Sequence, residues 1–378
     1  MRGYNTTSYK QCSQCIMDTN DDPFIKFDEK GVCNHCTTYV QEEKHFVKSG
    51  KEGEQELQSI IERIKADGKG KKYDCVLGIS GGVDSSYLAY VAKEWGIRPL
   101  GVHCDNGWNS ELAVQNIQSI VRTLDMDLDT YVINWDEFRD IQLAYLKANV
   151  IDIEAITDLA FRAVLKKTAH KYKVKYFLSG DNVVTESVLP RAWICKDTSN
   201  LLSIHEKFGS VPLKTYPLMT PLKELYYDKT NPTESLALLN LMDYKKDHVK
   251  EVIKTKLGWR DYGGKHFESV FTRFYQAYIL PNKFGVDKRK AHLSNLICSG
   301  QITKAEALEE LKEVYYPDEM MRIDKEFVLK KLGFSEQAFD EYMKAEPVPH
   351  EHYGIGKTIY DKYKILKLIR PIVNLIKN

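Results

Sequence analysis

Short apolar runs alternate with helical patterns between residues 73 and 230. Four runs are rich in Val, Ile, Leu and aromatic residues, as buried parallel strands are. They occupy residues 73–79, 98–106, 128–133 and 174–179. Between the runs, apolar residues recur at helical spacing, first from Leu88 to Trp95 and last from Ile156 to Val164. Strands that alternate with helices in this way predict an α/β fold with a doubly wound parallel sheet, which binds its ligands at the carboxyl ends of the strands.

The patterns on either side of this region differ from it. Before it, Leu57, Ile60, Ile61 and Ile64 predict one face of a short amphipathic helix that a polar stretch at 67–72 ends. After it, the chain is mostly helical in pattern and rich in aromatic residues.

Composition narrows the class of protein. Lys and Arg number 54 against 53 Asp and Glu, so the net charge is +1, which argues against a protein built to coat nucleic acid. No apolar run approaches the roughly 18 residues that span a bilayer. The first residues lack the apolar stretch of a secretory signal, and we therefore expect a cytoplasmic protein with reduced cysteines.

Four of the eight cysteines lie near the start of the chain: Cys12, Cys15, Cys33 and Cys36. Two C-x2-C pairs separated by seventeen residues have the spacing of a zinc site. Four thiolates leave no open coordination position, so they predict a structural Zn²⁺ in a small ribbon. His35 could replace one thiolate, or it could be an exposed turn residue. The alternative for the whole group is a set of unligated thiols.

A glycine-rich turn joins the first predicted strand to the first helix of the α/β region. Glycines let the backbone approach an anion, and the N–H groups and dipole of the following helix attract it. Hydroxyl groups add further donors, and Asp84 can hold Mg²⁺ against phosphates. The residues predicted to bind phosphate are Ser80, Gly81, Gly82, Asp84, Ser85 and Ser86.

This turn resembles the PP-loop of ATP pyrophosphatases, whose signature S-G-G-x-D-S it matches at every fixed position. The resemblance implies an adenine nucleotide site at the end of the second strand, near His103 and Asp105. It also implies that Gly180 and Asp181 face the pyrophosphate, with Asp181 as a second Mg²⁺ ligand and Glu186 as a weaker one. Helix capping is the alternative role for both acids.

A late segment, Pro217-Leu218-Met219-Thr220-Pro221-Leu222-Lys223, is similar to the P-L segment of the same superfamily. The resemblance implies that Lys223 neutralises charge on the leaving pyrophosphate. A solvated lysine at the start of a helix is the alternative.

The last third carries a local basic cluster in a neutral protein: Lys265, His266, Lys283, Lys288, Arg289 and His292. Such a cluster suits a small anion such as a carboxylate or a diphosphate. A charged, solvated helix face is the alternative. Thr303 and Glu306 have the spacing of a capping box at the start of a further helix.

Together these blocks resemble the N-acetyl sugar amidotransferases of lipopolysaccharide O-antigen and other surface-glycan biosynthesis, a branch of the PP-loop enzymes. The most specific blocks are 12–19, 264–269 and 283–289. The resemblance implies that ATP adenylates an acetamido oxygen on a nucleotide-activated sugar and that ammonia then displaces AMP to leave an acetamidino group. It implies ATP and Mg²⁺ as cofactors. It also implies that Lys265, His266, Glu268, Lys283, Lys288 and Arg289 bind the substrate.

The resemblance implies that a separate glutaminase and cyclase-like protein pair supplies the ammonia, because no glutaminase motif surrounds the remaining cysteines. The main rival function is that of a tRNA-modifying PP-loop enzyme, either a thiolase or a lysidine-type ligase. A zinc-ribbon binding module on a degenerate nucleotide fold is a third possibility, which the intact loop disfavours. The +1 net charge argues against a nucleic-acid partner.

These observations predict five segments along the chain. A zinc ribbon (1–40) and a helical connector (41–72) precede a PP-loop ATP pyrophosphatase domain (73–230). A helical substrate-binding region (231–350) and a basic amphipathic tail (351–378) follow. The tail could contact an anionic membrane peripherally, contact a partner, or dock on the protein itself.

Overall fold

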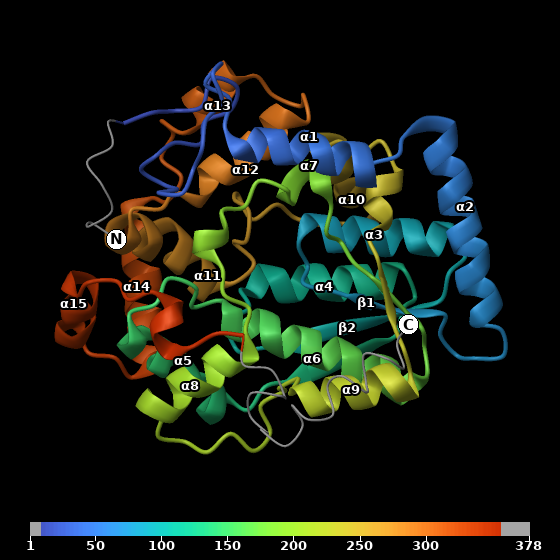
Figure 1. The fold of residues 1–378 in the computed structure, drawn as a ribbon. Coiled ribbons are helices and arrows are strands. Elements are labelled where there is room, and N and C mark those ends of the chain that lie inside the picture. Colours follow the sequence, from blue (N-terminus) through green and yellow to red (C-terminus); the bar gives the residue numbers. More distant parts are fainter. Residues whose placement is uncertain (1–8, 357–378) are drawn as a thin grey trace, which may run out of the picture.

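A five-stranded parallel sheet forms the centre of the computed structural model, which describes residues 9–356 (Figure 1). The strands are β1 (Cys75–Gly78), β2 (Pro99–Asp105), β3 (Leu128–Val132), β4 (Tyr176–Leu178) and β5 (Glu234–Leu236). Their order across the sheet is β3-β2-β1-β4-β5. The chain thus runs outward from β1 to β3 and returns to β4 on the other side of β1. The predicted doubly wound α/β fold is confirmed.

Helices cover both faces of the sheet. Successive strand residues point to opposite faces, so each strand has apolar side chains to bury on both sides. Leu77 of β1 packs in one cluster with residues of α2 (Gly50–Asp67), α3 (Val83–Glu94), α4 (Glu111–Thr123) and α10 (Lys246–Leu257). The neighbouring Val76 packs on the other face with Val164 of α6 (Ala155–Tyr172). In Figure 1, α3 and α4 lie on one side of the strands and α6 on the other.

Two elements of the sheet region were not predicted. Helix α5 (Trp135–Ala148) has polar residues within its buried face, and Glu137 accepts hydrogen bonds from the backbone N–H groups of Thr215 and Tyr216. Strand β5 has three residues, of which Glu234 and Ser235 are exposed, so it lacks an apolar run. With β5 in the sheet and α10 packed on it, the α/β region extends beyond residue 230.

The remaining helices come later in the chain, after β4 and after α10. Those that follow β4 are α7 (Val183–Glu186), α8 (Thr198–Phe208) and α9 (Pro221–Thr230). Those that follow α10 are α11 (Val270–Phe274), a π-helical segment (Tyr275–Phe284), α12 (Lys288–Cys298), α13 (Lys304–Glu310), α14 (Asp318–Leu332) and α15 (Glu336–Lys344). The predicted capping box starts α13. Short 3-10 turns lie at Arg191–Trp193, Leu238–Leu241 and His350–Tyr353.

The N-terminal segment is irregular up to α1 (Asn34–Phe46), which crosses the predicted boundary at residue 40. Two single-residue antiparallel bridges, Gln11 with Asp18 and Phe27 with Cys33, stand where a ribbon was predicted. Among the described residues, no helix is long and apolar enough to cross a membrane. Most of the predicted basic tail, residues 357–378, lies outside the described residues.

Buried ion pairs attach the N-terminal segment to α12. The Lys290 ammonium lies 2.6 Å from Asp18 Oδ2 and also contacts the Asp21 carboxylate, and both acids are buried. Asp21 further accepts the backbone N–H of Asp287, at the start of α12. Two carboxylates out of water need this lysine, because an unpaired buried charge costs several kcal/mol.

We therefore expect Lys290→Met to destabilise the protein by about 3 kcal/mol, because it leaves two carboxylates unpaired. The thermal unfolding midpoint should fall by about 5 °C or more. Lys30→Met, at an exposed position of the same segment, is the matched control and should unfold like the unaltered protein. Equal midpoints for the two variants would contradict the role assigned to Lys290.

Candidate active site and metal site

The predicted phosphate loop lies between β1 and α3, at the carboxyl end of the sheet. Ser80 Oγ accepts a hydrogen bond from the Gly82 N–H at 3.1 Å and lies 3.1 Å from Ser85 Oγ. The Ser85 and Ser86 hydroxyls donate to the Gly82 carbonyl at 3.3 and 2.6 Å. These contacts fold the loop back on the first turn of α3, whose N–H groups and dipole favour an anion.

Two aromatic residues far along the sequence hold the turn at Gly81. Its φ of +82° favours glycine, and a Cβ there would lie 2.9 Å from the Tyr262 hydroxyl. Trp259 Nε1 and the Tyr262 hydroxyl donate to the Gly81 carbonyl at 2.8 and 2.7 Å. These two hydrogen bonds fix the orientation of the Gly81 carbonyl. The sequence does not indicate these contacts, because neither aromatic residue lies in a nucleotide-binding motif.

The end of β4 closes against the loop. A Cβ on Gly180 would lie 3.3 Å from the Asp84 side chain and 3.3 Å from the Ser85 nitrogen, so glycine permits the close approach. Asp84 Oδ1 accepts a hydrogen bond from the Tyr244 hydroxyl. Within residues 9–356, Asp84 Oδ2 accepts no hydrogen bond and is available to a cation. Asp181 follows Gly180 and is exposed.

The predicted adenine-reading residues lie at the end of the neighbouring strand β2. His103 is buried, with Nδ1 2.8 Å from the Ile79 carbonyl and Nε2 3.0 Å from Asn109 Nδ2. A carbonyl can only accept a hydrogen bond, so Nδ1 donates to Ile79. Asp105 Oδ1 accepts from the Gly107 N–H at 2.8 Å. His103 is therefore held in place by the backbone that leads into the phosphate loop.

Part of the predicted substrate-binding set borders the loop. Lys265 lies 3.3 Å from Glu186 Oε1, and His266 lies 3.7 Å from Glu268. Glu268 Oε1 would lie 3.6 Å from a Cβ on Gly82. The carboxyl pKa of Glu268 is lowered, because contacts from His266 outweigh its burial. A segment from the helical region thus reaches the phosphate loop of the sheet domain.

Other predicted residues make their contacts elsewhere. The Lys283 ammonium donates to the carbonyls of Tyr342 and Ala345 at the end of α15. Arg289 pairs with Asp287 at 2.7 Å. Lys288 lies 3.6 Å from the carboxylate of Glu154, the residue directly before α6. Lys223 is exposed in the first turn of α9. No contact in the described part of the chain brings Lys223, Lys283 or Arg289 to the phosphate loop.

Two lysines that sequence analysis did not select also lie in this region. Lys246 begins α10, two residues after Tyr244, and the charges of Asp84 and Lys265 act on it. Lys196 lies 2.9 Å from Asp158, and the charge of Asp181 acts on it. Neither lysine belongs to a motif, and only the packing of distant segments reveals their position.

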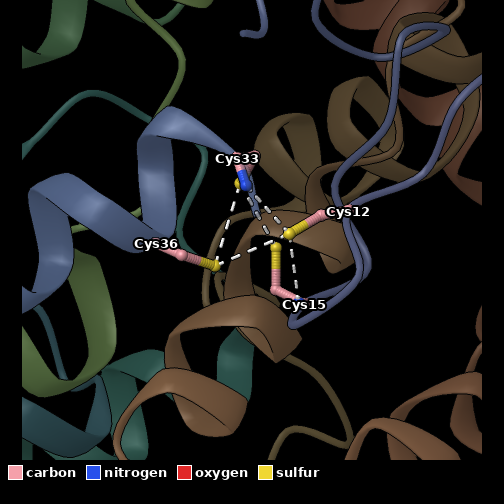
Figure 2. A group of neighbouring side chains, drawn as sticks. All are labelled: Cys12, Cys15, Cys33 and Cys36. Atoms are coloured by element: carbon pink, nitrogen blue, oxygen red, sulfur yellow. Dashed lines mark hydrogen bonds between the residues drawn. The ribbon is translucent and has the colours of Figure 1, made fainter. Parts of the chain in front are cut away.

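The four N-terminal cysteines form a separate group, as Figure 2 shows. Their sulfur atoms all lie within 4.8 Å of one another, and all four residues are buried. The Cys12–Cys36, Cys15–Cys33 and Cys33–Cys36 sulfur distances are 3.8, 3.6 and 3.8 Å. Sulfurs placed tetrahedrally at zinc's bond length lie about 3.8 Å apart, so the geometry fits Zn²⁺.

Two further residues adjoin the cysteine group. His35 points to Asp22, with Nε2 2.7 Å from the carboxylate, so it is neither in the sulfur group nor an exposed turn residue. Cys298, near the end of α12, lies with its sulfur 3.7 Å from that of Cys36. The sequence shows no pair that includes Cys298, because 262 residues separate it from Cys36.

The C-terminal region matches a known family. Residues 268–368 match the family described as the C-terminal domain of WbpG-like LPS biosynthesis proteins. This match confirms, for that region, the resemblance to lipopolysaccharide-biosynthesis enzymes that the sequence predicted. No curated protein matches the chain significantly.

Solved structures with some likeness to the chain include two synthetases. NMN synthetase of Francisella tularensis is 16% identical, with a TM-score of 0.29 over 58% of this chain and 92% of that one. NH3-dependent NAD synthetase of Campylobacter jejuni, in complex with nitrate, is 14% identical, with a TM-score of 0.28 over 54% of this chain and 93% of that one. At these TM-scores the likeness carries no functional argument.

We expect the purified protein to contain about one zinc ion per chain, because the four sulfurs fit one tetrahedral ion. Cys36→Ser should lower the zinc content severalfold, whereas Cys298→Ser, which changes the fifth sulfur, should leave it near one. Elemental analysis of the purified protein measures both. Zinc-free protein that is folded and active would refute the assignment.

Proposed function

We propose that this chain is an ATP-dependent amidotransferase, because residues 268–368 match the WbpG-like family of LPS biosynthesis domains. It converts an acetamido group of a nucleotide-activated N-acetyl amino sugar to an acetamidino group in surface-polysaccharide biosynthesis. The observation that supports this function best is the contact of the family segment with an S-G-G-x-D-S loop. Glu268 lies against Gly82, and Tyr262, just before the segment, holds Gly81.

The first step activates the amide. The acetamido oxygen attacks the α-phosphorus of ATP, and the bond to the bridging β-phosphate oxygen breaks. Pyrophosphate then leaves, and the N–H groups of the loop and of the first turn of α3 stabilise its negative charge. Fixed donors of this kind stabilise the transition state, because they need no reorientation as charge develops.

Asp84 and Asp181 are the residues that would hold Mg²⁺ beside this loop. The Asp84 oxygen without a hydrogen bond and the exposed Asp181 carboxylate offer the hard oxygen ligands that Mg²⁺ prefers. Bound there, Mg²⁺ would neutralise phosphate charge. The Tyr244 hydroxyl orients Asp84 by its hydrogen bond to Oδ1.

The second step replaces oxygen by nitrogen. Ammonia attacks the carbon of the adenylated amide, loses a proton, and the carbon–oxygen bond breaks to release AMP. An amide oxygen is a poor leaving group until it carries AMP, which is why ATP is required. We propose that ammonia comes from a separate glutaminase and cyclase-like pair, since free ammonia is mostly protonated at neutral pH.

We expect ATP to be cleaved to AMP and pyrophosphate in the presence of an acetamido sugar nucleotide and ammonium, and not when tRNA replaces the sugar. Asp84→Asn should lower kcat by about 100-fold or more, because it removes a charge beside the transferring phosphate. Lys93→Met, at the far end of α3, is the control. Chromatography of the nucleotides measures the products, and ADP with phosphate would refute the mechanism.

We also expect the isolated chain to use ammonium salts at high concentration but not glutamine. Glutamine should support the reaction only when the glutaminase pair is added. The readout is the mass of the sugar product, which falls by about one unit when O is exchanged for NH. Efficient use of glutamine by the pure chain would contradict the separate source of ammonia.

A further inference from the structure

Four basic side chains from three separate segments lie around His292 of α12. Lys265 and His266 precede the Glu268 segment, and Lys288 and His292 lie one turn apart on α12. Lys246 begins α10. The rings of His266 and His292 are 5.6 Å apart, and the charges of Lys246, Lys265 and Lys288 all act on His292.

Neighbouring residues bring two of these segments to the loop. Tyr244, two residues before Lys246, donates a hydrogen bond to Asp84. Glu268, two residues after His266, would lie 3.6 Å from a Cβ on Gly82. An anion bound by the group would therefore lie next to the phosphates that the loop is proposed to bind.

Carboxylates pair with most of the group but leave Lys246 without a counter-ion. Glu186 contacts Lys265, Glu154 contacts Lys288, and Glu268 contacts His266. Within residues 9–356, the Lys246 ammonium has no carboxylate at ion-pair distance, although the charges of Glu310 and Asp84 act on it. Burial, with Lys250 and Lys265 nearby, lowers the pKa of Lys246 below its usual value. A partly desolvated ammonium without a counter-ion is costly, and a bound anion would offset that cost.

His292 carries a second unsatisfied group. Its Nε2 atom is buried and has no hydrogen-bond partner among the described residues. Burial and the surrounding cations hold its pKa well below the usual value, so the ring is neutral. A neutral imidazole can donate from one nitrogen, and a buried donor without a partner costs about 1–3 kcal/mol.

We propose that Lys246, Lys265 and His292 form a diphosphate-binding subsite adjoining the phosphate loop. This inference rests on the proposed function and adds Lys246 and His292 to the site, while Lys283 and Arg289 bind elsewhere. Donors from three segments suit an anion with several oxygens. Two sources share this chemistry, namely the pyrophosphate that leaves ATP and the diphosphate of the nucleotide sugar.

The test is a calorimetric titration of the full chain with inorganic pyrophosphate and, separately, with UDP. Lys246→Met should weaken the binding of at least one of the two by about 10-fold or more, the effect of losing a charge-assisted hydrogen bond. Lys246→Arg should retain most of it. Lys245→Met is the matched control, because the adjacent Lys245 is exposed and pairs with Asp243. Its affinities should not change.

A thermal readout separates binding from folding. Lys246→Met removes a half-buried charge that has no counter-ion among the described residues, so the unliganded variant should unfold at the same temperature as the unaltered protein or higher. A lysine that served only the fold would lower the midpoint. If the variant nevertheless fails to fold, His292→Asn provides a second test, with the same loss of diphosphate affinity expected.

A non-hydrolysable ATP analogue distinguishes the two sources. If the subsite holds the pyrophosphate of ATP, the analogue should exclude both probes. If it holds the sugar diphosphate, UDP should still bind beside the analogue, and Lys246→Met should weaken that binding. Unchanged affinities of Lys246→Met for both probes would overturn the subsite. Because the titration measures binding and not turnover, that result leaves the proposed amidotransferase activity intact. In the product assay, tight diphosphate binding without any sugar product would refute the activity but not the subsite.

Discussion

The adjacency of β1 and β4 is the constraint on which the proposed site depends. The chain runs from β1 to β2 and β3 on one side and returns to β4 on the other side of β1. The carboxyl ends of β1 and β4 therefore lie next to each other, and no helix connects these two strands directly. The backbone at Gly180 can then approach Asp84 and Ser85 closely, with glycine leaving the space. Every group proposed to act on phosphate lies around this point, which is where open α/β sheets bind their ligands.

Residues that follow β5 along the chain hold the phosphate loop in shape. Trp259 and Tyr262 both hold the Gly81 carbonyl, and Tyr244 holds Asp84. The phosphate loop therefore takes part of its shape from residues more than 150 positions later. Glu268, the first residue of the segment that matches the WbpG-like family, lies beside Gly82 of the same loop.

Helices α12 and α13 connect the cysteine group to the rest of the protein. Lys290 joins α12 to Asp18 and Asp21 of the N-terminal segment, and Lys304 donates to the Cys12 carbonyl at 2.5 Å. Lys288 and His292, which flank Lys290, belong to the basic group beside the phosphate loop. A metal held by the four sulfurs would thus stiffen the support of one wall of the site rather than take part in the reaction.

The sequence by itself determined the parts that depend on local pattern. Alternating apolar runs specified four of the five strands, S-G-G-x-D-S specified the phosphate loop, and the C-x2-C pairs specified the cysteine group, because each signal lies within a few residues. The tertiary structure alone decided which basic residues meet. Lys283 and Arg289 have the same composition signal as Lys265, yet packing directs Lys283 to the end of α15. It also brings Lys246, which was not in the predicted cluster, near His292, which was. Charge along a sequence identifies side chains that can bind an anion. Only the folded chain determines which of these side chains lie near the anion without another partner.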